Sequence, residues 1–388
     1  MTELFETLAD LIRINSVNAF YAGGPGEADI GRYIENFFFD RGIETRRQVV
    51  LDENGSIEAR ANIIARIPGN DSNRRIVLEA HMDTVSVQGM SITPFEPSIQ
   101  NGLMYGRGAC DTKAGLAAMM HAVAAIHSSR VKPPCDVLLA AVVDEEYSFL
   151  GVKKLCEDLE ADAAIVAEPT ELRVAIASKG VLRWRILTTG ISAHSSKAHL
   201  GVNAIYHMAR IALAIEQDHA ALARAPYPLL GPASCNVGII AGGVQVNFVP
   251  DGCAIEIDRR LLPNESVAEV LSHYEKLLDG LKEVVPELNA RMEQPMLVDE
   301  AWTVDPSSSI VRVATHVLTD LGLNDQPIGV PFGSDASKLG RKGIPTIIFG
   351  PGSIDQAHGA IEYIELKQVV QAFDFYRGCL MTFGGANR

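Results

Sequence analysis

The chain has 388 residues, of which 47% are apolar and 21% are charged. At roughly 150 residues per domain, this length allows two or three domains with a sizeable core. The composition is that of an ordinary globular protein, which excludes a disordered chain, a collagen and a coiled-coil array. The net charge is −14, and no run of Lys or Arg is long enough to follow a phosphate backbone. We therefore expect no nucleic-acid partner.

The apolar strings, such as residues 137–143, are far shorter than the ~20 residues that a bilayer-spanning helix needs, so no membrane association is expected. Residues 2–8 carry acids where a secretory signal would carry bases, and they are typical of a first amphipathic helix. The six cysteines are scattered without a CxxC pair. This pattern favours idle thiols in a reducing compartment, and we expect a cytoplasmic protein.

In chain order, apolar strings alternate with helical periodicity, which is the rhythm of βαβ units. The strings are continuous, as in strands that are covered on both faces. In the first part of the chain, the pattern predicts strands over residues 75–80, 137–143 and 163–167 and a helix over residues 113–128. The last part predicts a helix over 308–323, a strand over 344–350 and a helix over 366–381.

The middle of the chain has a different pattern, βαββαβ. Its predicted elements are strands over 182–189, 235–240, 254–261 and 291–297, a helix over 202–216, and a second helix that follows a capping box formed by Ser266 and Glu269. We therefore predict an α/β protein with two domains. Residues 1–179 and 293–388 form a larger domain around a mostly parallel central sheet, and residues 180–292 form an inserted ferredoxin-like domain.

Polar side chains that could bind a metal follow the ends of the predicted strands, where an open parallel sheet has its ligand crevice. They are His81, Asp83, Glu145, Glu146, Glu168 and His358, and Asp111 joins them from a glycine-rich loop. Each alone could be a solvated loop residue. Together, the carboxylates of Asp111, Glu145, Glu146 and Glu168 in one pocket would repel one another, so a cation must balance these four charges. Two histidines among oxygen ligands suit zinc or a similar ion, and two ions that share a carboxylate would absorb this charge.

Several stretches resemble the dizinc amidohydrolase family, which contains acetylornithine deacetylase, succinyl-diaminopimelate desuccinylase, aminoacylase and the glutamate-releasing carboxypeptidases. They are HMDTV (81–85), YGRGACDTKAG (105–115), DEE (144–146), EPT (168–170), GISAHSS (190–196), GSD (333–335) and FGPG (349–352) through His358. These motifs occur in family order, and acetylornithine deacetylase is closest in appearance.

The resemblance implies two divalent ions, with zinc favoured and cobalt or manganese as alternatives. His81 and Glu168 would hold one ion, Glu146 and His358 the other, and Asp111 would bridge both. Consistent with this, the three acids and two histidines of this set are oxygen and nitrogen donors of the kind that zinc accepts.

The resemblance also assigns catalytic roles. Asp83 would accept the second ring N–H of His81 and fix its tautomer. Glu145 would be the general base, which is consistent with adjacent residues of an extended chain pointing opposite ways. His194 would donate to the oxyanion across the interface of a homodimer formed by the inserted domain, which is a dimerisation and lid domain in the family. Its alternative role is a structural one in that contact.

Five further residues match positions that contact substrate in relatives: Asn247, Arg260, Gly333, Ser334 and Gly352. The planar guanidinium of Arg260 suits a carboxylate because it can bond both oxygens, and the glycines and Ser334 would supply backbone donors. A turn residue at Asn247 and a salt bridge at Arg260 are the alternatives.

We therefore expect metal-dependent hydrolysis of an amide bond in a small N-acyl amino acid. The alternatives are a dipeptidase or carboxypeptidase and an N-succinyl amino-acid desuccinylase. A non-catalytic binding protein is disfavoured because Glu145 and all five ligands are present. A dinucleotide-binding enzyme is disfavoured because no GxGxxG follows the first strand.

Overall fold

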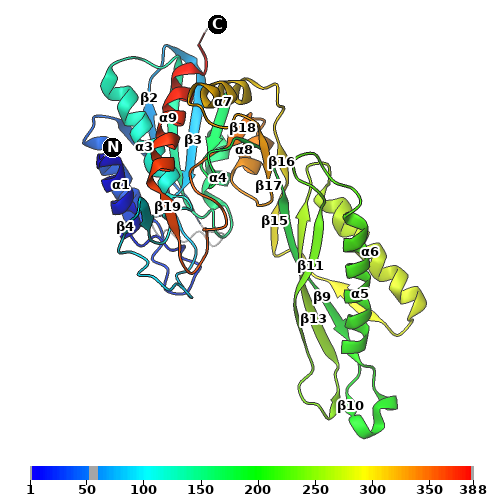
Figure 1. The fold of residues 1–388 in the computed structure, drawn as a ribbon. Coiled ribbons are helices and arrows are strands. Elements are labelled where there is room, and N and C mark those ends of the chain that lie inside the picture. The colour runs from blue at the N-terminus through cyan, green and yellow to red at the C-terminus, as the bar shows by residue number, and fades with distance from the viewer. Residues whose placement is uncertain (1, 52–59, 386–388) are drawn as a thin grey trace. The chain divides into compact units, whose positions relative to one another are not determined.

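The computed structural model describes residues 2–51 and 60–385, and the chain divides into two compact units (Figure 1). The first unit comprises Met1–Ile176, Val304–Ile328 and Ser334–Arg388, and the second comprises Ala177–Thr303 and Gly329–Gly333. The second unit extends farther along the chain than the expected insertion of residues 180–292. The reason is strand β15 (Leu297–Asp299), which pairs with β9 (Gly180–Thr189) of the second unit.

The first unit is built on a mixed sheet with a parallel centre. Its strands lie in the order β1 (Glu44–Val49), β2 (Ala61–Ile67), β6 (Cys135–Val142), β3 (Asp71–His81), β7 (Ala163–Val166), β18 (Thr346–Ile348) and β8 (Ala175–Ser178). Strands β6, β3, β7 and β18 run parallel to one another, whereas the pairs β1–β2, β2–β6 and β18–β8 are antiparallel. All residues of β6 are buried, as the continuous apolar string predicts. The predicted α/β fold class is confirmed.

Helices and a small sheet complete the first unit. The helices are α1 (Thr2–Arg13), α2 (Ala28–Phe39), α3 (Lys113–Ser129), α4 (Leu150–Asp158), α7 (Ser309–Asp320), α8 (Ala336–Arg341) and α9 (Leu366–Thr382). Helix α3 packs on α9 and on β3, so that two long helices far apart in the sequence lie side by side in this unit. A three-stranded sheet contains β4 (Ser98–Gln100), β5 (Leu103–Tyr105) and β19 (Tyr363–Glu365).

The second unit has an antiparallel sheet in the order β11 (Ser234–Gly242), β13 (Gly252–Leu261), β9 and β14 (Asn289–Met292). Its helices are α5 (Ala204–Leu222) and α6 (Val267–Val284), so the chain order is the predicted βαββαβ. Buried Trp184, Met208, Ile255 and Tyr274 join the sheet and both helices in one core. The predicted cap is present, because the Ser266 hydroxyl accepts a hydrogen bond from the Glu269 N–H at 3.2 Å.

One predicted strand of this unit, 291–297, is two strands in the structure. Both β14 and β15 pair with β9, and Pro295 lies between them without an N–H to donate to the ladder. Shorter elements are β10 (Ala193–His194), the 3₁₀ helix η1 (Ser195–Leu200), β12 (Phe248–Val249), β16 (Trp302–Thr303) and β17 (Ile328–Val330). Within the described ranges, no helix has both the length and the apolar character needed to cross a bilayer.

Candidate metal centre and active site

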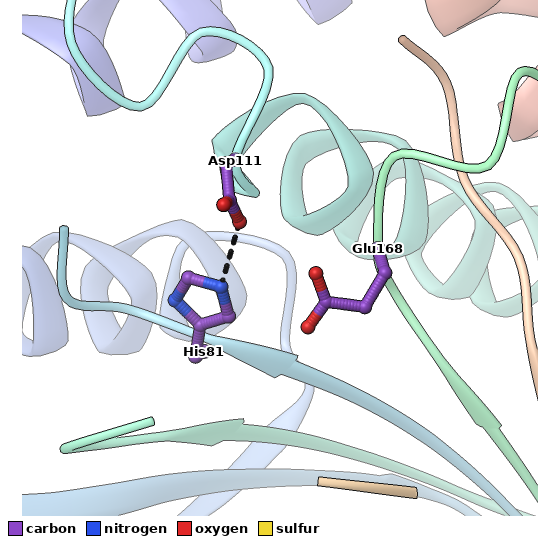
Figure 2. Close-up of side chains that lie close together, drawn as sticks. All are labelled: His81, Asp111 and Glu168. Atoms are coloured by element: carbon purple, nitrogen blue, oxygen red, sulfur yellow. Dashed lines mark hydrogen bonds and ion pairs between the residues drawn. The ribbon is translucent and has the colours of Figure 1, made fainter. Parts of the chain in front are cut away.

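The side chains of one histidine and two acidic residues lie close together at the carboxyl edge of the central sheet (Figure 2). His81 ends β3, Glu168 follows the neighbouring parallel strand β7, and Asp111 lies in the loop before α3. Each offers a ligand atom within 4.8 Å of the others, and all three residues are buried. His81 Nε2 lies 3.1 Å from Asp111 Oδ1. Parallel pairing of β3 and β7 thus creates one candidate metal site.

Asp111 also belongs to a second group, with Glu146 and His358, whose ligand atoms again lie within 4.8 Å of one another. His358 Nε2 lies 3.1 Å from Glu146 Oε1 and 3.2 Å from Asp111 Oδ2. The His358 side chain is 50% exposed, whereas that of Asp111 is 7% exposed. The five residues expected as ligands therefore form two adjoining groups that share one buried carboxylate.

The electrostatics of the two groups fit divalent cations. Burial, followed by the neighbouring Asp111 carboxylate, raises the pKa of Glu168 and of Glu146 above the usual value. Burial alone would lower the pKa of His358, but hydrogen bonds with Asp111 and Glu146 outweigh it and raise the pKa to about 11. The carboxylates thus attract protons to themselves and to the histidine. Imidazole nitrogens and carboxylate oxygens are ligands that zinc accepts, so the donor set fits a metal that would replace these protons.

The loop that carries Asp111 is held by Glu362, a residue that the sequence analysis did not single out. The buried Glu362 carboxylate accepts hydrogen bonds from the N–H groups of Gly108, Cys110 and Asp111 at 3.0, 2.9 and 3.1 Å. It also accepts one from the buried Arg107 guanidinium at 2.7 Å. A buried charge needs a buried partner of opposite charge. The presence of Arg107 in this glycine-rich loop was therefore the feature of the sequence that could have indicated an acidic partner such as Glu362.

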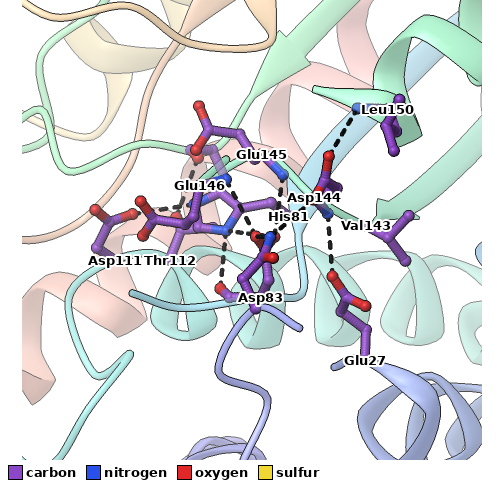
Figure 3. Close-up of polar contacts among 12 residues, drawn as sticks. Glu27, His81, Asp83, Asp111, Thr112, Val143, Asp144, Glu145, Glu146 and Leu150 are labelled. Carbon is purple, nitrogen blue, oxygen red and sulfur yellow. Dashed lines mark hydrogen bonds and ion pairs between the residues drawn. The ribbon is translucent and has the colours of Figure 1, made fainter. Parts of the chain in front are cut away.

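Asp83 contacts both His81 and the turn that carries the two glutamates. His81 Nδ1 donates to the main-chain oxygen of Asp83 at 3.0 Å, and the nearer carboxylate oxygen is 3.6 Å away. The Asp83 carboxylate also accepts the N–H groups of Glu145 and Glu146 at 3.2 and 3.1 Å (Figure 3). Asp83 therefore fixes the turn that presents both glutamates, besides orienting the imidazole through its backbone.

Glu145 lies beside the ligand groups without belonging to either. Burial raises the pKa of its carboxyl group well above the usual value, with further increases from Asp335, Glu146 and Asp111, while His81 opposes them. A raised pKa brings a carboxyl group closer to the range in which it can both take up and release a proton. This environment suits an acid–base group.

Two predicted residues of the second unit lie close together, His194 on β10 and Asn247 directly before β12, which pairs with β10. His194 pairs with Phe248, and the Ser195 N–H donates to the main-chain oxygen of Asn247 at 2.9 Å. The side chain of His194 is exposed, and its Nδ1 accepts a hydrogen bond from the Ser196 N–H at 3.2 Å. An accepting Nδ1 places the proton of a neutral imidazole on Nε2, which is the state that an oxyanion donor needs.

The other expected substrate contacts have partners within the protein. Arg260, on β13, donates from Nε to Asp258 at 2.8 Å, as its salt-bridge alternative predicts. The Gly352 N–H donates to Gln368 Oε1 at 2.8 Å, so that group is not the free donor expected from sequence. Gly352 has a φ of 86°, and a Cβ there would lie 2.5 Å from Cys110 Sγ. Gly333 packs against Asp299. Ser334 is buried, and its hydroxyl accepts a hydrogen bond from the Ala336 N–H at 3.4 Å.

Fold and site together define a metallohydrolase. Residues 77–382 match the peptidase family M20/M25/M40, and the chain belongs to this family. It is 29% identical over 343 residues to an acetylornithine deacetylase from Myxococcus xanthus, which covers 85% of each chain. It is 26% identical over 352 residues to an N-formyl-4-amino-5-aminomethyl-2-methylpyrimidine deformylase from Halalkalibacterium halodurans, covering 83% of this chain and 82% of that one.

Among solved structures, the fold is similar to that of the YXEP protein from Bacillus subtilis, described as a dinuclear metal-binding peptidase of the M20 family. The TM-score is 0.72 at 16% identity, and the match covers 98% of this chain and 97% of that chain. The chain is thus an M20 metallohydrolase, as the resemblance of its motifs predicts.

Proposed function

We propose that this protein hydrolyses the amide bond of a small N-acyl amino acid, as an N-deacylase similar to acetylornithine deacetylase. The observation that carries the proposal is the pair of His, Asp and Glu groups that share Asp111, with Glu145 beside them. The similarity to an acetylornithine deacetylase along most of both chains supports an acyl amino acid as substrate.

Two divalent ions, with zinc favoured over cobalt or manganese, are proposed to be held by the two groups, with Asp111 bridging. His81 and Glu168 would complete one set of ligands, and Glu146 and His358 the other. When bound, such ions polarise a carbonyl group and make water more acidic. The dinuclear metal binding ascribed to the B. subtilis YXEP protein supports this stoichiometry.

The residues of the chain supply the other steps. Glu145 takes a proton from the attacking water and passes it to the nitrogen of the leaving amine, which its raised pKa favours. Asp83 holds the Glu145 and Glu146 N–H groups during this transfer. We propose His194 as the hydrogen-bond donor to the developing oxyanion, and Arg260 and Asn247 as contacts to the substrate carboxylate.

We further propose a homodimer formed by the second unit and a cytoplasmic location. The exposed side chains of Ile239 and Ile240 on the edge strand β11 support a subunit contact. The six cysteines are free thiols, which supports a reducing compartment.

The acyl group and the amino acid are the open part of the proposal, because a single polar contact can decide such a specificity. A dipeptidase or carboxypeptidase is the main alternative, and an N-succinyl amino-acid desuccinylase is the second. The name of the H. halodurans relative adds N-formyl compounds to the substrates to be tested.

The experiment is an assay of metal-loaded protein against N-acetyl, N-succinyl and N-formyl amino acids and simple dipeptides. We expect the highest kcat/KM for an N-acetyl amino acid, and loss of activity with a chelator that zinc, cobalt or manganese restores. Preferential cleavage of dipeptides would establish the alternative. Full activity in protein shown by elemental analysis to lack metal would refute the proposed chemistry.

A further inference from the structure

A buried amide lies behind the turn that presents Glu145 and Glu146. Asn18 is fully buried, and its Nδ2 donates to Asp83 Oδ2 at 2.7 Å and to Asp144 Oδ1 at 2.9 Å. Its Oδ1 accepts the N–H of Phe20 at 3.0 Å. Both amide hydrogens and the amide oxygen are thus engaged, and rotation of the amide by 180° would turn its oxygen toward two carboxylates. The environment therefore fixes the orientation of Asn18.

The two carboxylates that Asn18 joins control the two ends of the catalytic turn. Asp83 accepts the N–H groups of Glu145 and Glu146. Asp144 precedes both glutamates, adopts a left-handed backbone with a φ of 67°, and accepts the hydroxyl of Ser148. Without a donor between them, two buried carboxylates would repel each other and pull the turn apart.

The charge of this region is balanced farther from the site by Arg60. Its guanidinium bonds Glu27 at 2.6 Å and Asp144 at 2.9 Å. The Asp144 N–H in turn donates to Glu27 Oε1 at 3.2 Å (Figure 3). Both Arg60 and Asn18 donate to Asp144. A continuous chain of hydrogen bonds therefore runs from Arg60 through Asp144 and Asn18 to Asp83.

The segment around Asn18 is fixed to the same turn by two further contacts. The rings of Phe20 and Tyr147 stack with their centroids 4.2 Å apart, and the Tyr21 hydroxyl donates to the main-chain oxygen of Glu146 at 3.1 Å. This segment precedes residue 77, at which the family match begins. Residues outside the matched region therefore contact the Glu145–Glu146 turn, which belongs to one of the family motifs.

We propose that Asn18 is a positioning residue for the acid–base and metal-binding functions of the Glu145–Glu146 turn. This inference rests on the proposed function, and it deepens it. By joining Asp83 to Asp144, the Asn18 amide sets the direction in which Glu145 faces the reacting groups and in which Glu146 faces its metal. It touches neither substrate nor metal itself.

The test compares Asn18→Asp with Asn62→Asp. Asn62 is an equally buried amide of the same unit, which donates to Gln48 and Gly151 and accepts the Val143 N–H at 3.2 Å, so it holds the strand before Asp144 without joining Asp83 to Asp144. We measure thermal stability, kcat and KM on the best substrate, and the affinity of both metal sites by titration of metal-free protein. We expect Asn18→Asp to lower kcat by ~100-fold with KM nearly unchanged, and to weaken one metal site by ~10-fold or more, as loss of an outer partner does. Asn62→Asp should lower stability and leave kcat and metal affinity unchanged.

A folded Asn18→Asp protein with kcat and metal affinities within ~2-fold of wild type would overturn the inference. If this variant does not fold, Asn18→Ser decides, because its hydroxyl keeps one donor and should cause a smaller loss of kcat; unchanged kcat in it would also overturn the inference. A wild type that binds two ions but cleaves no substrate of the panel would refute the proposed function. The metal affinity of the variants would then decide the role of Asn18 alone.

Discussion

The candidate residues of the two units differ in how the protein holds them. In the first unit, three of the five proposed ligands, His81, Asp111 and Glu168, are buried, and the loop of Asp111 is fixed by the four hydrogen bonds to Glu362. In the second unit, His194 and Asn247 are exposed on a short ribbon. Groups that bind a metal need fixed geometry before the metal arrives, whereas groups that meet a changing substrate benefit from access. The difference predicts that variants of the first unit alter metal binding, and that variants of the second unit leave it intact.

The largest expected effects separate the adjacent glutamates of the first unit. Glu145→Gln removes the acid–base group and keeps every proposed ligand, so kcat should fall by ~10²–10⁴-fold or more with metal content unchanged. Glu146→Gln removes a charged ligand, so one site should lose affinity and metal content should approach one ion per chain. Metal content and kcat are to be measured for both variants together.

Excess metal provides the internal control for this pair. It should restore activity to Glu146→Gln and have no effect on Glu145→Gln. Equal loss of metal in both variants, or turnover close to wild type in Glu145→Gln, would contradict the assignment of Glu145 as the base.

The next effect concerns the second unit. His194→Ala should lower kcat by ~10²–10³-fold, the size expected for one oxyanion donor, while metal content stays at the wild-type value. Mixing inactive His194→Ala chains with inactive Glu145→Ala chains tests whether the donor serves the other subunit. Partial recovery of activity is expected, since some mixed dimers would contain one intact site. No recovery after proven exchange of subunits would rule out a shared site.

Glu362→Gln tests the clamp on the Asp111 loop. The amide nitrogen of the glutamine would face either the N–H groups of the loop or Arg107, and the buried Arg107 guanidinium would lose its carboxylate partner. Because the Asp111 loop would then be held less firmly, metal affinity should fall by ~10-fold or more. Glu365→Gln is the matched control, because Glu365 is exposed three residues away and bonds Gln368. Metal titration and thermal unfolding of both variants check the prediction, and equal behaviour of the two would disprove a special role for Glu362.

The smallest effect is a pH dependence of stability that is remote from the metal ligands. Burial lowers the pKa of His121, whose Nε2 lies 2.8 Å from the Thr7 hydroxyl, to about 4. The unfolded chain therefore binds more protons than the folded chain between about pH 4 and its ordinary pKa of 6.5. The stability contributed by neutral His121 is complete above that ordinary pKa and is lost as the pH falls toward about 4.

His121→Gln should remove this dependence. Between about pH 7 and about pH 5, wild type should lose roughly 1 kcal/mol more free energy of unfolding than the variant, a value reduced for partial exposure of the ring. Urea unfolding at a series of pH values measures the difference. Parallel curves for the two proteins would show that His121 does not titrate in this way.

The sequence predicted those features that depend on short stretches of the chain, such as buried strands and the residues at their ends. The continuous apolar string of residues 137–143 predicted a buried strand, and the position of His81 at the end of another predicted the metal-binding edge. The pairing of Arg107 with Glu362 could not be predicted, because it joins residues far apart in sequence. The hydrogen bond from Gly352 to Gln368 likewise depends on how the loop of Gly352 packs against the start of α9. Such partners are decided by tertiary packing, which a motif does not record.

Strand β18 has a consequence for the order in which the protein is completed. It lies between β7 and β8 in the sheet, although β8 ends at Ser178 and β18 begins at Thr346. Until the ribosome has made that late strand, β7 has a free edge on one side, and His358 and Glu362 do not yet exist. A nascent chain that already contains His81, Asp111, Glu146 and Glu168 therefore has neither a closed sheet nor a fixed Asp111 loop. The final stretch of synthesis supplies both, so chains that stop early should be exposed to aggregation and proteolysis rather than accumulate as partly active enzyme.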